Sequence, residues 1–270
     1  MEALRTIDMW GARTAAAGVT RADRELATHG PRGEPLRWAS VTKLLTGLAT
    51  LVAVEEGTVD LDEPAGPPGS TLRHLLSHAS GLPPEDGPPL MPPAARRIYS
   101  NAGIEAAAAL VAARAEMPFG DYLRASVLDP LSLSGGLRSS PAWGYAGPLD
   151  DLLKLGRELL APTLVAAETL AEAISVQFPG LAGVLPSWGR MDPNDWGLAF
   201  ELRDDKEPHW TSARSSPRTF GHFGAAGTFL WVDPDAGLAC GVLTDREFGD
   251  WAIEAWPRLN DAVLAEVALL

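Results

Sequence analysis

The chain has little lysine and almost no cysteine. Its 22 basic residues include only Lys43, Lys154 and Lys206 as lysines, and Cys240 is its one cysteine. A lone cysteine excludes an intrachain disulfide framework and cannot build a thiolate metal site by itself. Because Cys240 lies within the apolar run GLACGVL, we expect its side chain to be buried.

Long apolar runs and clusters of positive charge are also missing. No run approaches the ~18 apolar residues of a membrane span, and the first residues, MEALRTIDMW, lack the apolar stretch of a secretion signal. The net charge of -13 comes without a basic cluster, which argues against nucleic acid and anionic membranes as partners. We therefore expect a cytoplasmic protein that acts on a small molecule.

Strand patterns occupy both ends of the chain and helical patterns fill its middle. Predicted strands cover residues 14–20, 25–30, 196–204, 228–233 and 237–243. Apolar residues recur at helical spacing from Ser40 to Gly57, helical stretches alternate with loops over 71–174, and a final helix is predicted over 250–267. The order predicts an α+β protein, in which an antiparallel sheet built from both chain ends, with flanking helices, carries an inserted and mostly helical lobe.

This organisation predicts a single domain over residues 1–270. The α/β lobe would comprise residues 1–57 and 195–270, and the helical lobe residues 58–194. Ligand sites favour the seam between such lobes, where the loops at 83–98 and 180–195 are expected to form the pocket walls.

The stretch RWASVTKLLTG places Ser40 and Lys43 three positions apart at the start of a predicted helix. Side chains at i and i+3 lie on one helical face, about 5–6 Å apart at Cβ. A desolvated lysine can lose its proton and act as a base, which arginine cannot do. A nucleophile, its base and an oxyanion donor can thus come from one turn. The alternative is that Ser40 caps the helix and Lys43 is solvated.

Two further stretches carry unusual combinations of residues. RRIYSNAGIE contains Tyr99 and Asn101, of which Asn101 is alternatively the N-cap of the alanine-rich helix that follows. GHFGAAG places His222 beside glycines, which let another backbone or a ligand come close.

In this order, the segments SVTK, LRHLLSHASGLP, YSN and GHFGAAG resemble the penicillin-recognising serine hydrolase superfamily. Within it, the chain is most similar to the branch of class C β-lactamases, D-alanyl-D-alanine carboxypeptidases and related esterases. The resemblance extends from about Ala15 to the final helix. It implies the β-lactamase/transpeptidase-like fold, and neither a metal nor another cofactor.

The resemblance also implies roles for individual residues. Ser40 would be the acylated nucleophile and Lys43 the base that takes its proton. Tyr99 would relay protons to the leaving group and activate the deacylating water. Asn101 would orient Lys43 and contact the substrate.

The last segment would supply the remaining substrate contacts. His222 stands where many members have the lysine of Lys-Thr-Gly. The backbone N–H groups of Ser40 and Ala225, the latter following Gly224, would form the oxyanion hole. Phe223 replaces the hydroxyl residue that holds a substrate carboxylate in many members.

These departures favour small carboxylic esters as substrates, because His222 would be only partly charged at pH 7 and Phe223 offers no donor but could contact an apolar ester. The alternative is a β-lactamase or D-alanyl-D-alanine carboxypeptidase. A second alternative is a homologue that binds but no longer turns over. The partner is in each case a small-molecule ester, amide or β-lactam.

Other readings of the histidines and serines carry less weight. His74 and His78 lie one helical turn apart, as metal ligands would, but no third ligand is evident. No Gly-x-Ser-x-Gly segment supports an α/β-hydrolase. His29 and His209 belong to no motif and are expected on the surface.

Overall fold

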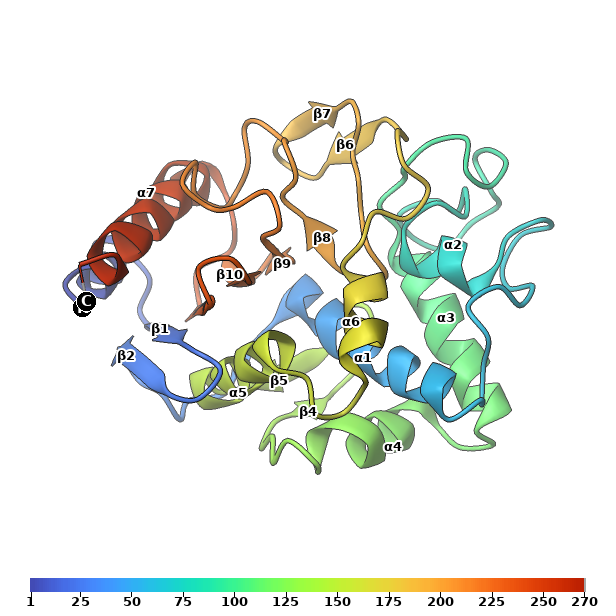
Figure 1. Ribbon diagram of the computed structural model, residues 1–270, viewed down its shortest axis with the longest axis horizontal. Helices are drawn as coiled ribbons and strands as arrows, with labels where there is room; N and C mark the ends of the chain where they lie inside the picture. Colours follow the sequence, from blue (N-terminus) through green and yellow to red (C-terminus); the bar gives the residue numbers. More distant parts are fainter. Residues whose placement is uncertain (270) are drawn as a thin grey trace.

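A six-stranded antiparallel sheet lies at the centre of the computed structural model, which describes residues 1–269. Its strand order is β2 (Glu25–His29), β1 (Ala15–Thr20), β11 (Leu238–Thr244), β10 (Thr228–Asp233), β9 (Phe220–Gly224) and β8 (Glu201–Leu202). Strands from the two ends of the chain are neighbours, since Ala15 of β1 pairs with Thr244 of β11. The predicted α+β fold, with a sheet built from both chain ends, is therefore confirmed (Figure 1).

Helices cover both faces of this sheet. Along β10, Phe229 and Trp231 pack in one cluster with α7 (Asp250–Val267) and the 3-10 helix η1 (Ala3–Met9). Leu230 and Val232 point to the opposite face, into the core shared with α1 (Thr42–Glu55) and α5 (Leu149–Leu160). Side chains alternate along a strand, so a strand covered on both sides becomes apolar throughout, as TFLWVD is.

Helix α5 lies close against the sheet because two paired glycines leave it room. Gly18 of β1 is opposite Gly241 of β11. A Cβ atom at Gly18 would lie 2.7 Å from Leu153 Cδ1, and one at Gly241 would lie 2.7 Å from Leu152 Cδ2. This helix falls within the segment 58–194 but covers the sheet, and the division into two lobes stays a prediction.

The middle of the chain consists of helices, short strands and long loops (Figure 1). It contains α2 (Leu72–Leu76), α3 (Asn101–Arg114), α4 (Phe119–Leu123), the π-helical turn η3 (Arg124–Leu128) and α6 (Ala167–Ala173). Two small sheets were not expected, and one of them joins this segment to residues 36–37. One has the order β3 (Leu36–Arg37), β5 (Tyr145–Gly147) and β4 (Gly136–Leu137), and the other pairs β6 (Gly183–Leu185) with β7 (Gly189–Met191).

Most long elements follow the predicted boundaries, and one does not. The final helix spans Asp250–Val267 as predicted, and the β10–β11 hairpin turns at residues 234–237. The strand predicted over 196–204 is reduced to Glu201–Leu202, because the N–H groups of Leu198 and Ala199 donate to Ala173 O and Leu76 O instead of to the sheet. No helix within residues 1–269 combines the length and apolarity needed to cross a membrane.

Candidate active site

Ser40 lies in a short 3-10 turn, η2 (Ala39–Val41), just before helix α1. The α-helix itself begins at Thr42, and its N-cap Val41 makes no side-chain capping bond, so the alternative of Ser40 as the helix cap is wrong. Ala39 has a φ of 47°, a left-handed conformation that costs a non-glycine residue about 1–3 kcal/mol. A strained residue next to a half-buried serine whose hydroxyl does not cap the helix is typical of a functional turn.

Lys43 is completely buried beside Ser40. Its Nζ donates to Ser40 Oγ at 3.2 Å, to Asn101 Oδ1 at 2.7 Å and to the carbonyl oxygen of Ala142 at 2.9 Å. All three acceptors are uncharged. Burial lowers the pKa of Lys43 to about 7, against the opposing effect of Glu85 and Glu105. The alternative of a solvated Lys43 is therefore wrong, and near neutral pH its amine can accept a proton.

The first turn of α3 brings Asn101 to this amine. Ser100 is the N-cap of α3, and its Oγ accepts a hydrogen bond from the N–H of Gly103 at 2.9 Å. The alternative of Asn101 as the cap is therefore wrong. The Asn101 side chain instead accepts from Lys43 and donates through Nδ2 to Glu85 Oε1 at 2.8 Å.

Tyr99 lies against the same amine, with Lys43 Nζ 4.8 Å from the centre of its ring. Its ring also contacts the rings of His78 and His222, at centroid distances of 4.7 and 5.8 Å. Burial raises the pKa of the Tyr99 phenol well above its usual value, and a hydrogen bond with Ser40 opposes this rise. The phenol thus remains protonated at neutral pH and can donate its proton.

His222 on β9 faces this group of side chains, but it carries no charge at neutral pH. Its Nδ1 lies 2.6 Å from the carbonyl oxygen of Phe223, so this nitrogen bears the hydrogen. Burial, reinforced by the positive charge of Lys43, lowers the pKa of His222 to about 3. The expectation that His222 is partly charged at pH 7 is therefore wrong.

Phe223 points to the other face of the sheet. Its ring is 5.5 Å from Phe248, 5.7 Å from Trp210 and 5.9 Å from Trp256 between centroids. Adjacent residues of a strand project to opposite faces, so His222 and Phe223 cannot both face one pocket. The expected contact between the Phe223 ring and an ester is therefore wrong.

Gly224 lets strand β9 approach the turn that carries Ser40. A Cβ atom at Gly224 would lie 2.5 Å from the carbonyl oxygen of Trp38 and 3.0 Å from Ala39 Cβ. Thr228 Oγ1 holds the same carbonyl through a hydrogen bond of 2.8 Å. Strand β9 thus packs against the turn η2 at Gly224, and Ala225 is the residue that follows it.

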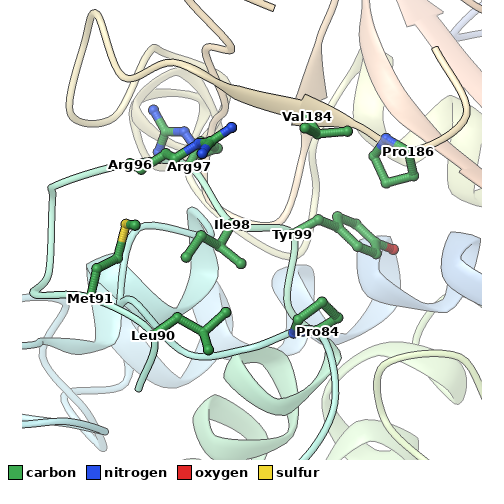
Figure 2. A pocket seen from close by; sticks show the side chains of 9 residues that line it. All are labelled: Pro84, Leu90, Met91, Arg96, Arg97, Ile98, Tyr99, Val184 and Pro186. Carbon is green, nitrogen blue, oxygen red and sulfur yellow. The ribbon is translucent and has the colours of Figure 1, made fainter. Parts of the chain in front are cut away.

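An apolar groove begins at Tyr99 (Figure 2). It has a volume of about 560 Å³ and is lined by Pro84, Leu90, Met91, Arg96, Arg97, Ile98, Tyr99, Val184 and Pro186. Its walls come from the two loops predicted to form them. In Figure 2 the Tyr99 hydroxyl points away from the end occupied by Arg96 and Arg97. The Arg97 guanidinium donates to backbone carbonyls, including those of Ser77 and Gln177 at 2.7 Å, so it is part of the wall.

The remaining histidines have structural contacts. His74 Nδ1 accepts from the N–H of Thr71 at 3.2 Å, and His78 Nδ1 accepts from the N–H of Ser100 at 3.1 Å. Across residues 1–269, no three His, Cys, Asp or Glu side chains are grouped to hold a metal ion. His209 is buried, with Nε2 2.9 Å from Glu201 Oε2, so its expected surface position is wrong.

The structure thus brings together Ser40, Lys43, Tyr99, Asn101 and His222, and Gly224 packs against the turn that carries Ser40. The catalytic roles of these residues stay predictions. Sequence reasoning missed Glu85 and Ala142, which contact this group. Both lie in loops without periodicity, and nothing in the local sequence marks them.

The family described as Beta-lactamase matches residues 7–264, and the chain belongs to this family. A β-lactamase (Mb2281c) from Mycobacterium bovis is 49% identical, with a TM-score of 0.97 over 98% of this chain and 99% of that one. No curated protein matches the sequence.

More distant proteins share the fold. Simvastatin synthase (LovD) from Aspergillus terreus is 17% identical, with a TM-score of 0.80 over 97% of this chain and 96% of that one. EstCE1, described as a hydrolase with promiscuous acyltransferase activity, is 18% identical, with a TM-score of 0.77 over 96% of each chain. At such identities the likeness concerns the fold alone.

Proposed function

We propose that the protein is a serine hydrolase that forms an acyl-enzyme on Ser40 and hydrolyses small carboxylic esters. The observation that carries this proposal is the buried Lys43 amine, 3.2 Å from Ser40 Oγ and with a pKa near 7. A base of this pKa is half deprotonated at neutral pH and regains its proton readily, which is optimal for general base catalysis.

In the proposed acylation step, neutral Lys43 accepts the proton of Ser40 while Ser40 Oγ attacks the ester carbonyl carbon. The backbone N–H groups of Ser40 and Ala225 stabilise the oxyanion. Tyr99 then donates its proton to the departing alkoxide. The Lys43 ammonium ion returns a proton to the resulting phenolate, so both side chains regain their starting forms. In deacylation, Tyr99 and Lys43 accept the proton of a water molecule while the water oxygen attacks the acyl carbon. Ser40 Oγ then leaves and takes up this proton, which releases the carboxylic acid and restores Ser40.

Two observations support a neutral ester over a β-lactam or a D-alanyl peptide. His222 is uncharged where many relatives of this superfamily carry a lysine, and Phe223 is turned away from the site. A substrate carboxylate would therefore be desolvated without these partners, at a cost of about 1–3 kcal/mol. The apolar groove that begins at Tyr99 suits an uncharged acyl or alcohol group.

The second candidate function is β-lactam hydrolysis. It is favoured by the 49% identity to the Mycobacterium bovis protein described as a β-lactamase. The third candidate, a binding homologue without turnover, predicts that Ser40 is never acylated.

One set of measurements separates these candidates. We expect kcat/KM to be higher for p-nitrophenyl butyrate than for nitrocefin or a D-Ala-D-Ala peptide, with Ser40→Ala as the blank. A higher value for nitrocefin or the peptide would replace the esterase proposal by the second candidate. A fluorophosphonate should add one label at Ser40, and the absence of both label and turnover would leave only the binding homologue.

A further inference from the structure

The loop at 83–98 is attached to the first turn of α3 at three points. Ser100 Oγ donates to the carbonyl oxygen of Pro83 at 2.6 Å, and the N–H of Asn101 donates to that of Pro84 at 2.8 Å. The third point is the hydrogen bond of 2.8 Å from Asn101 Nδ2 to Glu85 Oε1. Glu85 is thereby linked to the amine of Lys43 through a single side chain, since Asn101 Oδ1 accepts from Lys43 Nζ at 2.7 Å.

The chemistry of an amide makes this link directional. An asparagine side chain has an acceptor at one end and two donors at the other, and an ionised carboxylate only accepts. With Glu85 bound to Nδ2, Oδ1 must face Lys43. The flipped amide would place its oxygen against the Glu85 carboxylate and its NH₂ group against the amine. The ammonium form of Lys43 has no acceptor, so in that form both hydrogen bonds would be lost. Glu85 therefore selects the orientation in which Asn101 can hold Lys43.

Glu85 also adds a negative charge near an otherwise neutral cluster of hydrogen bonds. Other titratable side chains that interact with Lys43 come from several elements: Glu105 from α3, Tyr99, His78 from the segment after α2, and His222 from β9. Both histidines are uncharged at neutral pH, because burial lowers the pKa of each. Glu85 and Glu105 are thus the anions that favour the protonated amine, against the larger effect of burial.

We propose that Glu85 is a positioning residue of the base: through Asn101 it holds the Lys43 amine against Ser40, and its charge tunes when that amine is free to accept a proton. The proposal rests on the proposed acyl-enzyme function. Glu85 itself is exposed and needs no contact with substrate to act in this way.

Three variants separate the hydrogen bond from the charge. Glu85→Gln keeps an oxygen acceptor but removes the charge, whereas Glu85→Ala removes both. Asp86→Asn is the matched control, because Asp86 is the adjacent exposed carboxylate and makes no hydrogen bond within residues 1–269. Both positions are exposed, so the three variants are expected to fold, and urea unfolding checks this.

The expected readout is the pH profile of kcat/KM for p-nitrophenyl butyrate. Loss of the anion favours neutral Lys43, so the acidic limb should move to lower pH by about 0.5–1 unit in Glu85→Gln and Glu85→Ala, less than for a directly paired ion. On the alkaline plateau Glu85→Gln should stay within about threefold of wild type, while Glu85→Ala should fall about tenfold, since Asn101 is no longer oriented. Asp86→Asn should change neither quantity.

A second readout does not depend on turnover. With only three lysines in the chain, ¹³Cε-labelled lysine gives a simple NMR spectrum, in which Lys43→Arg identifies the Lys43 signal. The titration midpoint of this signal should move to lower pH in both Glu85 variants. Unchanged midpoints would overturn the proposal, even if Glu85→Ala lost activity, because the residue would then serve only loop packing. If wild type showed no Ser40-dependent turnover, the proposed function would fail while the titration still decided the role of Glu85.

Discussion

Lys43 and Lys206 are both buried lysines, but their surroundings differ. Lys43 donates only to the neutral oxygens of Ser40, Asn101 and Ala142. Lys206 Nζ lies 2.5 Å from the carboxylate of Glu201, which also accepts from His209 and Trp210. Burial alone would raise the pKa of Glu201, but His209 and Lys206 together lower it to about 2.

The difference shows when a buried lysine becomes chemically useful. A carboxylate partner stabilises the ammonium form and turns the pair into part of the core. Neutral partners satisfy the hydrogen bonds of the amine without fixing its proton, so burial can bring the pKa of Lys43 to about 7. The same residue type is thus structural near β8 and a candidate base beside Ser40.

The largest expected effect is on activity at Lys43. Lys43→Arg keeps a positive charge but cannot accept a proton, so kcat/KM for the ester should fall about 10²–10⁴-fold, nearly as far as in Lys43→Ala. Lys154→Arg, a change at the half-exposed lysine of α5, is the control and should leave kcat/KM unchanged. Substantial turnover by Lys43→Arg would mean that Lys43 supplies only charge.

Substitution of Lys206 should lower the stability of the fold and leave catalysis unchanged. Lys206→Met leaves the Glu201 carboxylate buried without its cation and should lower the free energy of unfolding by about 3–5 kcal/mol, measured with urea at pH 7. In Lys154→Met the loss should stay within about 0.5 kcal/mol. The comparison between the two lysines breaks down if Lys206→Met is as stable as wild type, or if folded Lys206→Met loses ester hydrolysis as Lys43→Arg does.

The pH dependence of catalysis should follow Lys43 alone. Its folded-state pKa of about 7 means that the amine is protonated, and inactive as a base, at lower pH. We expect kcat/KM to fall about tenfold per pH unit below pH 7 and to level off above it. The pKa of His222, about 3, lies outside this range. A flat profile from pH 5 to 9, with circular dichroism showing an intact fold, would contradict a titrating base.

A third buried lysine would sharpen the comparison. His222→Lys introduces a primary amine where the site has an uncharged ring, and the carboxylate of nitrocefin would then provide its counter-ion. The ratio of kcat/KM for nitrocefin to that for p-nitrophenyl butyrate should rise about tenfold. His222→Gln, which adds no charge, should leave this ratio near that of wild type. An equal rise in both variants would assign the effect to pocket shape.

The long elements of the fold could be predicted because their patterns are local. The final helix over 250–267 and the strands over 228–233 and 237–243 were predicted within one residue of their ends. The strands β3, β4 and β5 are two or three residues long, too short to show a period. The strand predicted over 196–204 was too long because two of its N–H groups bond with carbonyl oxygens at the ends of α2 and α6, which no local pattern reveals.

In the candidate site, too, some features follow from the local sequence and others depend on contacts between distant segments. The orientation of Phe223 could have been predicted, because neighbouring residues of a strand point to opposite faces. The comparison with Lys-Thr-Gly led to the wrong expectation, because it assigned His222 and Phe223 to the same substrate pocket. The burial of His209 could not have been predicted, because it depends on Glu201 in a different segment. Glu85 was missed for the same reason, since its contact with Asn101 joins a loop to a helix 16 positions away.

By itself the sequence determined that Ser40 and Lys43 share one helical face, because side chains three positions apart meet on any helix. Only the tertiary structure decided what Lys43 is. Its other acceptors, Asn101 and Ala142, lie 58 and 99 positions further along the chain. The pKa of the amine depends on the water removed by all the packed segments and on charges such as Glu85, and these quantities exist only once the chain has folded.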